Sequence, residues 1–126
     1  PDLKAASPEI CPGDAVLICS GWDAHWDDPD YVNGSPYIDR DAAMWLFDRG
    51  IGLLGADFPR FDSVSQMQFP WEEFWTRVNL LLAPLTNLSE LSGRCGMLAA
   101  FPLKIRGACA SPCRAVLIDI EEKPCL

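Results

Sequence analysis

Two short apolar segments limit the folds available to this chain more than any other feature of its sequence. Residues 14–20 contain an apolar run bounded by Pro12-Gly13 and Ser20-Gly21, and we predict a buried strand there; we predict that residues 51–56 form the next strand. A helical segment separates them: it begins at residue 41 after the N-cap Asp39 and ends at Gly50. A strand–helix–strand order predicts that the two strands are parallel neighbours in one sheet.

The rest of the chain completes a mixed pattern of short elements. We expect helices at 72–77 and 85–91, and strands at 80–82, 96–105 and 113–120. The predicted class is α+β: a mixed, strand-rich, single domain over residues 1–126, a length typical of one domain. On the helix that begins at residue 41, Ala42, Trp45 and Leu46 fall on one face.

The charge balance excludes two classes of partner. Eighteen acidic residues against ten basic ones give a formal net charge of −8. Binding to nucleic acid or to an anionic membrane surface normally needs a basic surface, so we expect neither partner. No apolar run reaches the roughly 18 residues that a membrane helix needs. The start of the chain has no signal-peptide pattern, and we therefore expect a cytoplasmic protein.

The cysteine and histidine content argues against a structural metal centre. The chain has six cysteines and one histidine, whereas a zinc ribbon needs two close cysteine pairs, or one pair with two histidines. Cys109 and Cys113 form a Cys-x3-Cys spacing that is compatible with free thiols or with one disulfide. Cys19 lies in an apolar run and is expected to be a small buried hydrophobe.

The segment 21–38 is an unusually long loop, rich in acidic and aromatic residues, and loops of this kind are often functional. It holds the lone His25 among several aspartates, so two interpretations stay open: a metal site, or a polar surface loop. A histidine-dependent hydrolase could use only His25, and no serine lies in a Gly-x-Ser-x-Gly motif.

Six ordered motifs give the chain a resemblance to a known family. Residues 12–22 are similar to the pattern GDxVLxxTGW, residues 41–51 to EAAxWLxxRGV, and residues 55–62 to GIDxPSxD. Three shorter motifs follow at 85–88, 101–105 and 111–116. Together they resemble the C-terminal part of the cyclase family, which includes bacterial kynurenine formamidase and isatin hydrolase. The resemblance implies the family's swivelling β/β/α fold, truncated at the N-terminus.

The resemblance also implies a metal-dependent hydrolase whose metal ligands this chain lacks. Family members hold zinc or manganese through an N-terminal His-x-Gly-Thr-His-x-Asp-x-Pro signature, which would lie upstream of Pro1. A second set of family ligands, a histidine and a glutamate twelve residues later, falls at Trp71 and Ala83. Neither side chain can ligate a metal ion. We therefore predict no catalytic residue and no metal or cofactor, unless a partner chain supplies ligands for zinc or manganese.

Three interpretations follow from this resemblance. The chain is a non-catalytic pseudoenzyme that serves as a binding or assembly module, or one subunit of a split amide or formamide hydrolase. Alternatively, it is an enzyme of different chemistry that reuses a pocket around Trp22, His25 and Asp57. Ser111 is a further candidate for that pocket, which would take a small-molecule ligand. Loss of the N-terminal strands would expose a sheet edge, so we also expect a homo-oligomer or a partner protein chain.

Overall fold

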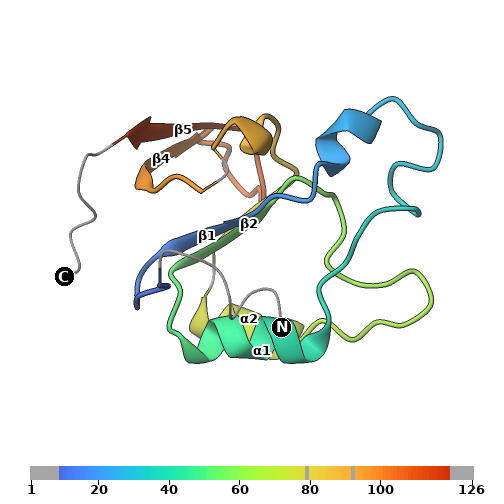
Figure 1. Ribbon diagram of the computed structural model, residues 1–126, viewed down its shortest axis with the longest axis horizontal. Coiled ribbons are helices and arrows are strands. Elements are labelled where there is room, and N and C mark those ends of the chain that lie inside the picture. Colours follow the sequence, from blue (N-terminus) through green and yellow to red (C-terminus); the bar gives the residue numbers. More distant parts are fainter. Residues whose placement is uncertain (1–8, 79, 92, 120–126) are drawn as a thin grey trace. The chain divides into compact units, whose positions relative to one another are not determined.

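The computed structural model describes residues 9–78, 80–91 and 93–119, which form two compact units (Figure 1). The first unit, Pro1–Ser92, contains both helices and a three-stranded sheet, and the second, Gly93–Leu126, contains a hairpin. The predicted α+β class is confirmed, while its organisation as a single domain over 1–126 stays a prediction. In the described part of the chain no helix is long and apolar enough to cross a membrane.

The elements of the first unit alternate between strand and helix. In chain order they are β1 (Ala15–Ile18), the 3-10 helix η2 (Trp22–His25), α1 (Arg40–Asp48), β2 (Leu53–Ala56), α2 (Trp71–Arg77), β3 (Leu81–Leu82) and the 3-10 helix η3 (Leu88–Leu91). The sheet order is β1-β2-β3, and both pairings are parallel. Ala15 pairs with Leu53, and Leu54 pairs with Leu81. This confirms the predicted parallel neighbours.

Helix α1 has the ends that the sequence predicts. The Asp39 side chain accepts a hydrogen bond from the backbone N–H of Ala42 at 2.8 Å, and Gly50 after the helix has a φ of +71°. An N-cap carboxylate satisfies an amide that the first helical turn leaves free, and glycine adopts a positive φ without strain. The sequence therefore determined both boundaries to within one residue.

Helix α1 packs one face against the core of the first unit. Helices α1 and α2 lie together on one side of the sheet (Figure 1), and a hydrogen bond of 2.8 Å joins Arg77 to Asp48 across them. The α1 residues buried in the core are Ala43, Leu46 and Phe47, while Ala42 and Trp45 are partly buried and pack against the same core. The ring of Phe47 packs against Phe69 and Phe74, which follow β2 in the sequence.

The core of the first unit is largely aromatic. The Phe47 ring contacts Phe69 edge-on at a centroid distance of 6.0 Å, and Phe69 in turn contacts Phe61 at 5.5 Å. Phe74 on α2 is fully buried against the same rings. Such edge-to-face and tilted pairs stabilise a core beyond the area that they bury. These rings fix the irregular segment 57–70 against the helices.

Cys19 is exposed, so its predicted burial was wrong. It lies just beyond the last residue of β1, where the chain leaves the sheet and the alternating inward direction of the strand no longer applies. The cysteines in the part of the chain that the structure describes are free thiols: Cys11, Cys19, Cys95, Cys109 and Cys113. The Cys109–Cys113 disulfide is therefore absent from this structure, and Cys125 lies outside the described residues.

The second unit is an antiparallel hairpin of β4 (Gly96–Pro102) and β5 (Cys113–Asp119). The predicted strand 96–105 ends early, at Pro102, and the last residue of the predicted strand 113–120 is not among those described. The register pairs Met97 with Ile118 and Ala99 with Val116. These side chains and Phe101 share one face because successive residues of a strand alternate in direction. Apart from Arg114, which lies opposite Phe101, that face is apolar, and it is mostly exposed.

Candidate functional site

The segments that follow the three parallel strands share one edge of the sheet. Parallel strands end on the same edge, and binding sites in such sheets commonly lie just beyond their carboxyl ends. The loop after β1 contacts the segment after β3 there: the Asn87 backbone N–H donates to Asp23 Oδ2 at 2.8 Å. Two carboxylates after β2, Asp57 and Asp62, organise this edge.

Asp57 is a fully buried carboxylate that holds the loop after β1 in place. Its Oδ1 and Oδ2 accept the Ser20 backbone N–H at 3.0 and 2.8 Å, and Oδ1 also accepts the Ser20 hydroxyl at 2.7 Å. Oδ2 further accepts the Gly21 N–H at 2.6 Å, and Gly21 has a φ of +79°. Both oxygens are therefore engaged with the chain itself, which makes Asp57 an anchor of the loop.

Trp22 and His25 form a small cluster within their own loop. Their rings stack at a centroid distance of 4.4 Å, and Trp22 Nε1 donates to the Tyr31 carbonyl oxygen at 2.9 Å. His25 Nδ1 lies 2.7 Å from Asp28 Oδ2, with about half of each side chain exposed. The loop therefore folds on itself around the indole, as long functional and structural loops both do.

Tyr31 carries a polar atom that the sequence did not single out. Its hydroxyl is buried and has no hydrogen-bond partner within the described structure. Burial, and secondarily the charges of Asp57 and Asp23, raise the pKa of this phenol above its ordinary value. The group therefore keeps its proton at neutral pH and remains an unused donor within the loop.

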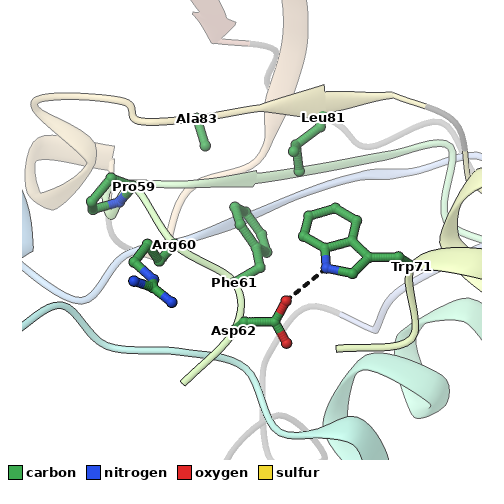
Figure 2. A pocket seen from close by; sticks show the side chains of 7 residues that line it. All are labelled: Pro59, Arg60, Phe61, Asp62, Trp71, Leu81 and Ala83. Carbon is green, nitrogen blue, oxygen red and sulfur yellow. Dashed lines mark hydrogen bonds between the residues drawn. The ribbon is translucent and has the colours of Figure 1, made fainter. Parts of the chain in front are cut away.

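A cavity of about 270 Å³ lies beside this edge of the sheet (Figure 2). Its lining residues come from the segment after β2, from the start of α2, and from β3 and the residue after it: Pro59, Arg60, Phe61, Asp62, Trp71, Leu81 and Ala83. Trp71 and Ala83 are the two positions to which the resemblance assigned the missing metal ligands. The fold brings these two positions, twelve residues apart in the chain, to one cavity.

Asp62 is the second organising carboxylate, and it lines the cavity. Its Oδ1 accepts the backbone N–H groups of Gln68 at 2.8 Å and of Phe69 at 2.7 Å. Its Oδ2 accepts the Trp71 indole N–H at 2.7 Å, which is the dashed contact in Figure 2. Partial burial raises the pKa of Asp62, but these three donors and the charge of Arg60 outweigh it and hold the pKa below its usual range. Asp62 is therefore an ionised group at neutral pH.

The donor set of this cavity does not fit the divalent metal that the family resemblance implies. A zinc or manganese site needs nitrogen, sulfur or oxygen lone pairs aimed at one point. Ala83 has none, and the Trp71 indole nitrogen is an N–H donor already directed at Asp62. Within residues 9–78, 80–91 and 93–119, no group of three or more His, Cys, Asp or Glu side chains is placed to hold a metal ion.

The remaining sequence candidates are divided between the two units. Trp22, His25 and Asp57 lie together after β1 and β2, in the first unit. Ser111 belongs to the second unit, just before β5, and its hydroxyl contacts the Pro112 carbonyl oxygen at 3.3 Å. Arg60 and Asp62 were not predicted as site residues, although Asp62 matches the motif GIDxPSxD and Arg60 replaces its serine.

The first unit is of the mixed class, with a parallel sheet and a cavity beside the carboxyl ends of its strands. Comparison with known proteins gives the family. The family model described as Putative cyclase matches residues 1–63, which is half of the chain. Kynurenine formamidase of Geobacillus thermodenitrificans (strain NG80-2) is 34% identical over 103 residues, covering 81% of this chain and 48% of that protein. No solved structure gives a significant match. The chain belongs to the cyclase family, and it spans about half the length of this curated relative.

The first prediction concerns the hydrogen bond between Trp71 and Asp62. The substitution Trp71→Phe keeps an aromatic ring but removes the indole donor, and should lower the free energy of unfolding by about 1 kcal/mol. Trp75→Phe is the matched control, because Trp75 lies on the same helix, is 53% exposed and makes no described hydrogen bond; we expect a change below about 0.5 kcal/mol. Urea unfolding measures both, and equal losses would contradict the assigned role.

The second prediction uses the lowered pKa of Asp62. An acid whose pKa is lower in the folded than in the unfolded state stabilises the fold at pH values above its unfolded pKa of about 3.9. This contribution is lost as the pH falls through the folded pKa. At pH 7, Asp62→Asn should therefore lower the free energy of unfolding by about 2 kcal/mol, because N–H donors lose their carboxylate acceptor. This difference from the wild type should become smaller as the pH falls towards 3. Urea unfolding at several pH values tests this, and a constant difference would contradict it.

Proposed function

We propose that this chain is a non-catalytic member of the cyclase family that acts as a binding or assembly module. The observation that carries the proposal is the identity of the side chains at the two expected ligand positions. Trp71 and Ala83 line one cavity with Asp62, and the indole N–H of Trp71 donates a hydrogen bond to Oδ2 of Asp62. Without metal ligands the cavity cannot generate the metal-activated water that the resemblance implies for the family's hydrolysis. The cavity itself remains as a place for a ligand.

A second candidate is a subunit or portion of a split formamide hydrolase, with the metal held by another chain. It is supported by the kynurenine formamidase relative, of which this chain covers 48%. In that case the partner would supply the nitrogen and oxygen ligands, and Trp71 would shape a substrate pocket. The substitutions at Trp71 and Ala83 favour the first proposal, because a shared metal site gives a reason to retain ligands at these positions.

An enzyme of different chemistry around Trp22, His25 and Asp57 has less support. Both Asp57 oxygens accept hydrogen bonds from Ser20 and Gly21, so neither is free to act as a base. His25 is stacked on Trp22 and paired with Asp28 on a half-exposed surface. General acid–base catalysis needs a group within hydrogen-bond reach of a bound substrate, and these contacts leave only His25 for that role.

The third prediction separates the non-catalytic proposal from an intact hydrolase. The purified chain, dialysed against zinc or manganese, should retain no stoichiometric metal and should not hydrolyse an aryl formamide above the buffer rate. Elemental analysis and an absorbance assay measure the two quantities. The double variant Trp71→His, Ala83→Glu adds two ligating side chains and should bind zinc more tightly than the wild type. Stoichiometric metal with turnover in the wild type would overturn the non-catalytic proposal.

The fourth prediction concerns assembly through the exposed apolar face of the hairpin. A two-stranded hairpin is marginally stable alone, and an apolar face of this kind marks an association surface. The chain should therefore form a dimer or larger oligomer at micromolar concentration in light scattering. Val116→Lys, at a position 48% exposed on that face, should shift the chain towards monomer. Gln66→Lys, an exposed change of the same charge in the first unit, should not.

Two results would contradict this prediction. A wild-type chain that is monomeric at micromolar concentration would remove the proposal of self-association. An oligomer that persists in Val116→Lys would exclude the hairpin face as the interface. The edge strands β1 and β3 would then be the next candidates for the interface.

A further inference from the structure

Arg60 is a charged group of the cavity whose hydrogen-bonding capacity is unused. It follows β2 and lines the cavity (Figure 2), yet its guanidinium makes no hydrogen bond or ion pair with any described residue. A guanidinium carries five N–H donors and stays protonated under all ordinary conditions. The family motif GIDxPSxD has a serine at this place, so the cation is a departure of this chain from the pattern.

The nearby carboxylate does not satisfy Arg60. Asp62 is close enough for the Arg60 charge to contribute to its lowered pKa, but its oxygens are turned towards other donors. They accept N–H groups from Gln68, Phe69 and Trp71 at 2.7 to 2.8 Å. The Asp62 carboxylate is therefore hydrogen-bonded within the protein, whereas the Arg60 guanidinium has donors available for a bound ligand.

The rest of the lining is apolar and partly aromatic. Besides Arg60 and Asp62 the cavity is bounded by the side chains of Pro59, Phe61, Trp71, Leu81 and Ala83. Its volume of about 270 Å³ lies just below the range typical of drug-sized ligands, which favours a small molecule. A partly exposed indole and a methyl group offer a flat, apolar surface, while the arginine offers paired donors that match the geometry of a carboxylate.

We propose that this cavity binds a small organic carboxylate, with its carboxylate group on Arg60 and its apolar body against Trp71 and Ala83. The proposal rests on the binding function proposed above, because it uses the same cavity, and it adds the chemical class of the ligand. Loss of the Arg60 charge should therefore weaken binding, whereas loss of an arginine elsewhere should not.

The experiment uses para-fluorobenzoate as the probe and follows its fluorine NMR line on addition of the full chain. The uncharged para-fluorobenzamide has nearly the same shape, and trifluoroacetate has the charge without the ring. We expect broadening with para-fluorobenzoate, and little with the other two. Arg60→Gln should weaken binding of para-fluorobenzoate about tenfold or more, as expected for loss of a charge-assisted hydrogen bond. Arg106→Gln, an exposed change of equal charge in the second unit, should leave binding unchanged.

Each alternative outcome overturns the proposal. Absence of broadening with para-fluorobenzoate, equal broadening with the amide, or unchanged binding in Arg60→Gln would show that the cavity does not hold a carboxylate through Arg60. Equal binding of trifluoroacetate would remove the apolar part of the site. Circular dichroism of Arg60→Gln checks that the variant is folded. These failures would leave the metal and turnover results untouched, so they are distinguishable from a failure of the proposed function.

Discussion

The buried carboxylate of Asp57 is the interaction on which the arrangement of the sheet edge depends. It joins the end of β2 to the first residues after β1, through Ser20 and Gly21. A buried charge is tolerated only when hydrogen bonds replace its lost hydration, and here the backbone itself supplies them. Asp57 therefore fixes the start of the loop that carries Trp22. The segment that begins at Asp57 also supplies residues that line the cavity, from Pro59 onwards.

The second carboxylate repeats this principle on the other side of the segment. Asp62 is held ionised by three N–H donors, one of which is the indole of Trp71. The cavity thus has an anion that is satisfied internally and a cation, Arg60, that is not. This imbalance distinguishes the cavity from a metal site, in which carboxylates present free oxygens to a cation. The proposed binding of an organic anion rests on these contacts of Arg60 and Asp62.

The family relationship and the site chemistry therefore give different kinds of information. The match to the family model and the kynurenine formamidase relative establish descent. Function depends on particular side chains placed on the fold, and a shared fold does not by itself transfer an activity. At Trp71, Ala83 and Arg60 this chain differs from the patterns associated with the family, and all three residues are among those that line the cavity.

The sequence by itself determined the parallel strand pair, the ends of α1 at Asp39 and Gly50, and the absence of ligating side chains at Trp71 and Ala83. These depend on local rules: apolar runs, capping chemistry and residue identity. The tertiary structure alone decided which residues of α1 are fully buried, that Cys19 is exposed, and that Arg60 and Trp71 line one cavity. These features depend on packing between segments that are distant in the chain, so local sequence rules do not predict them.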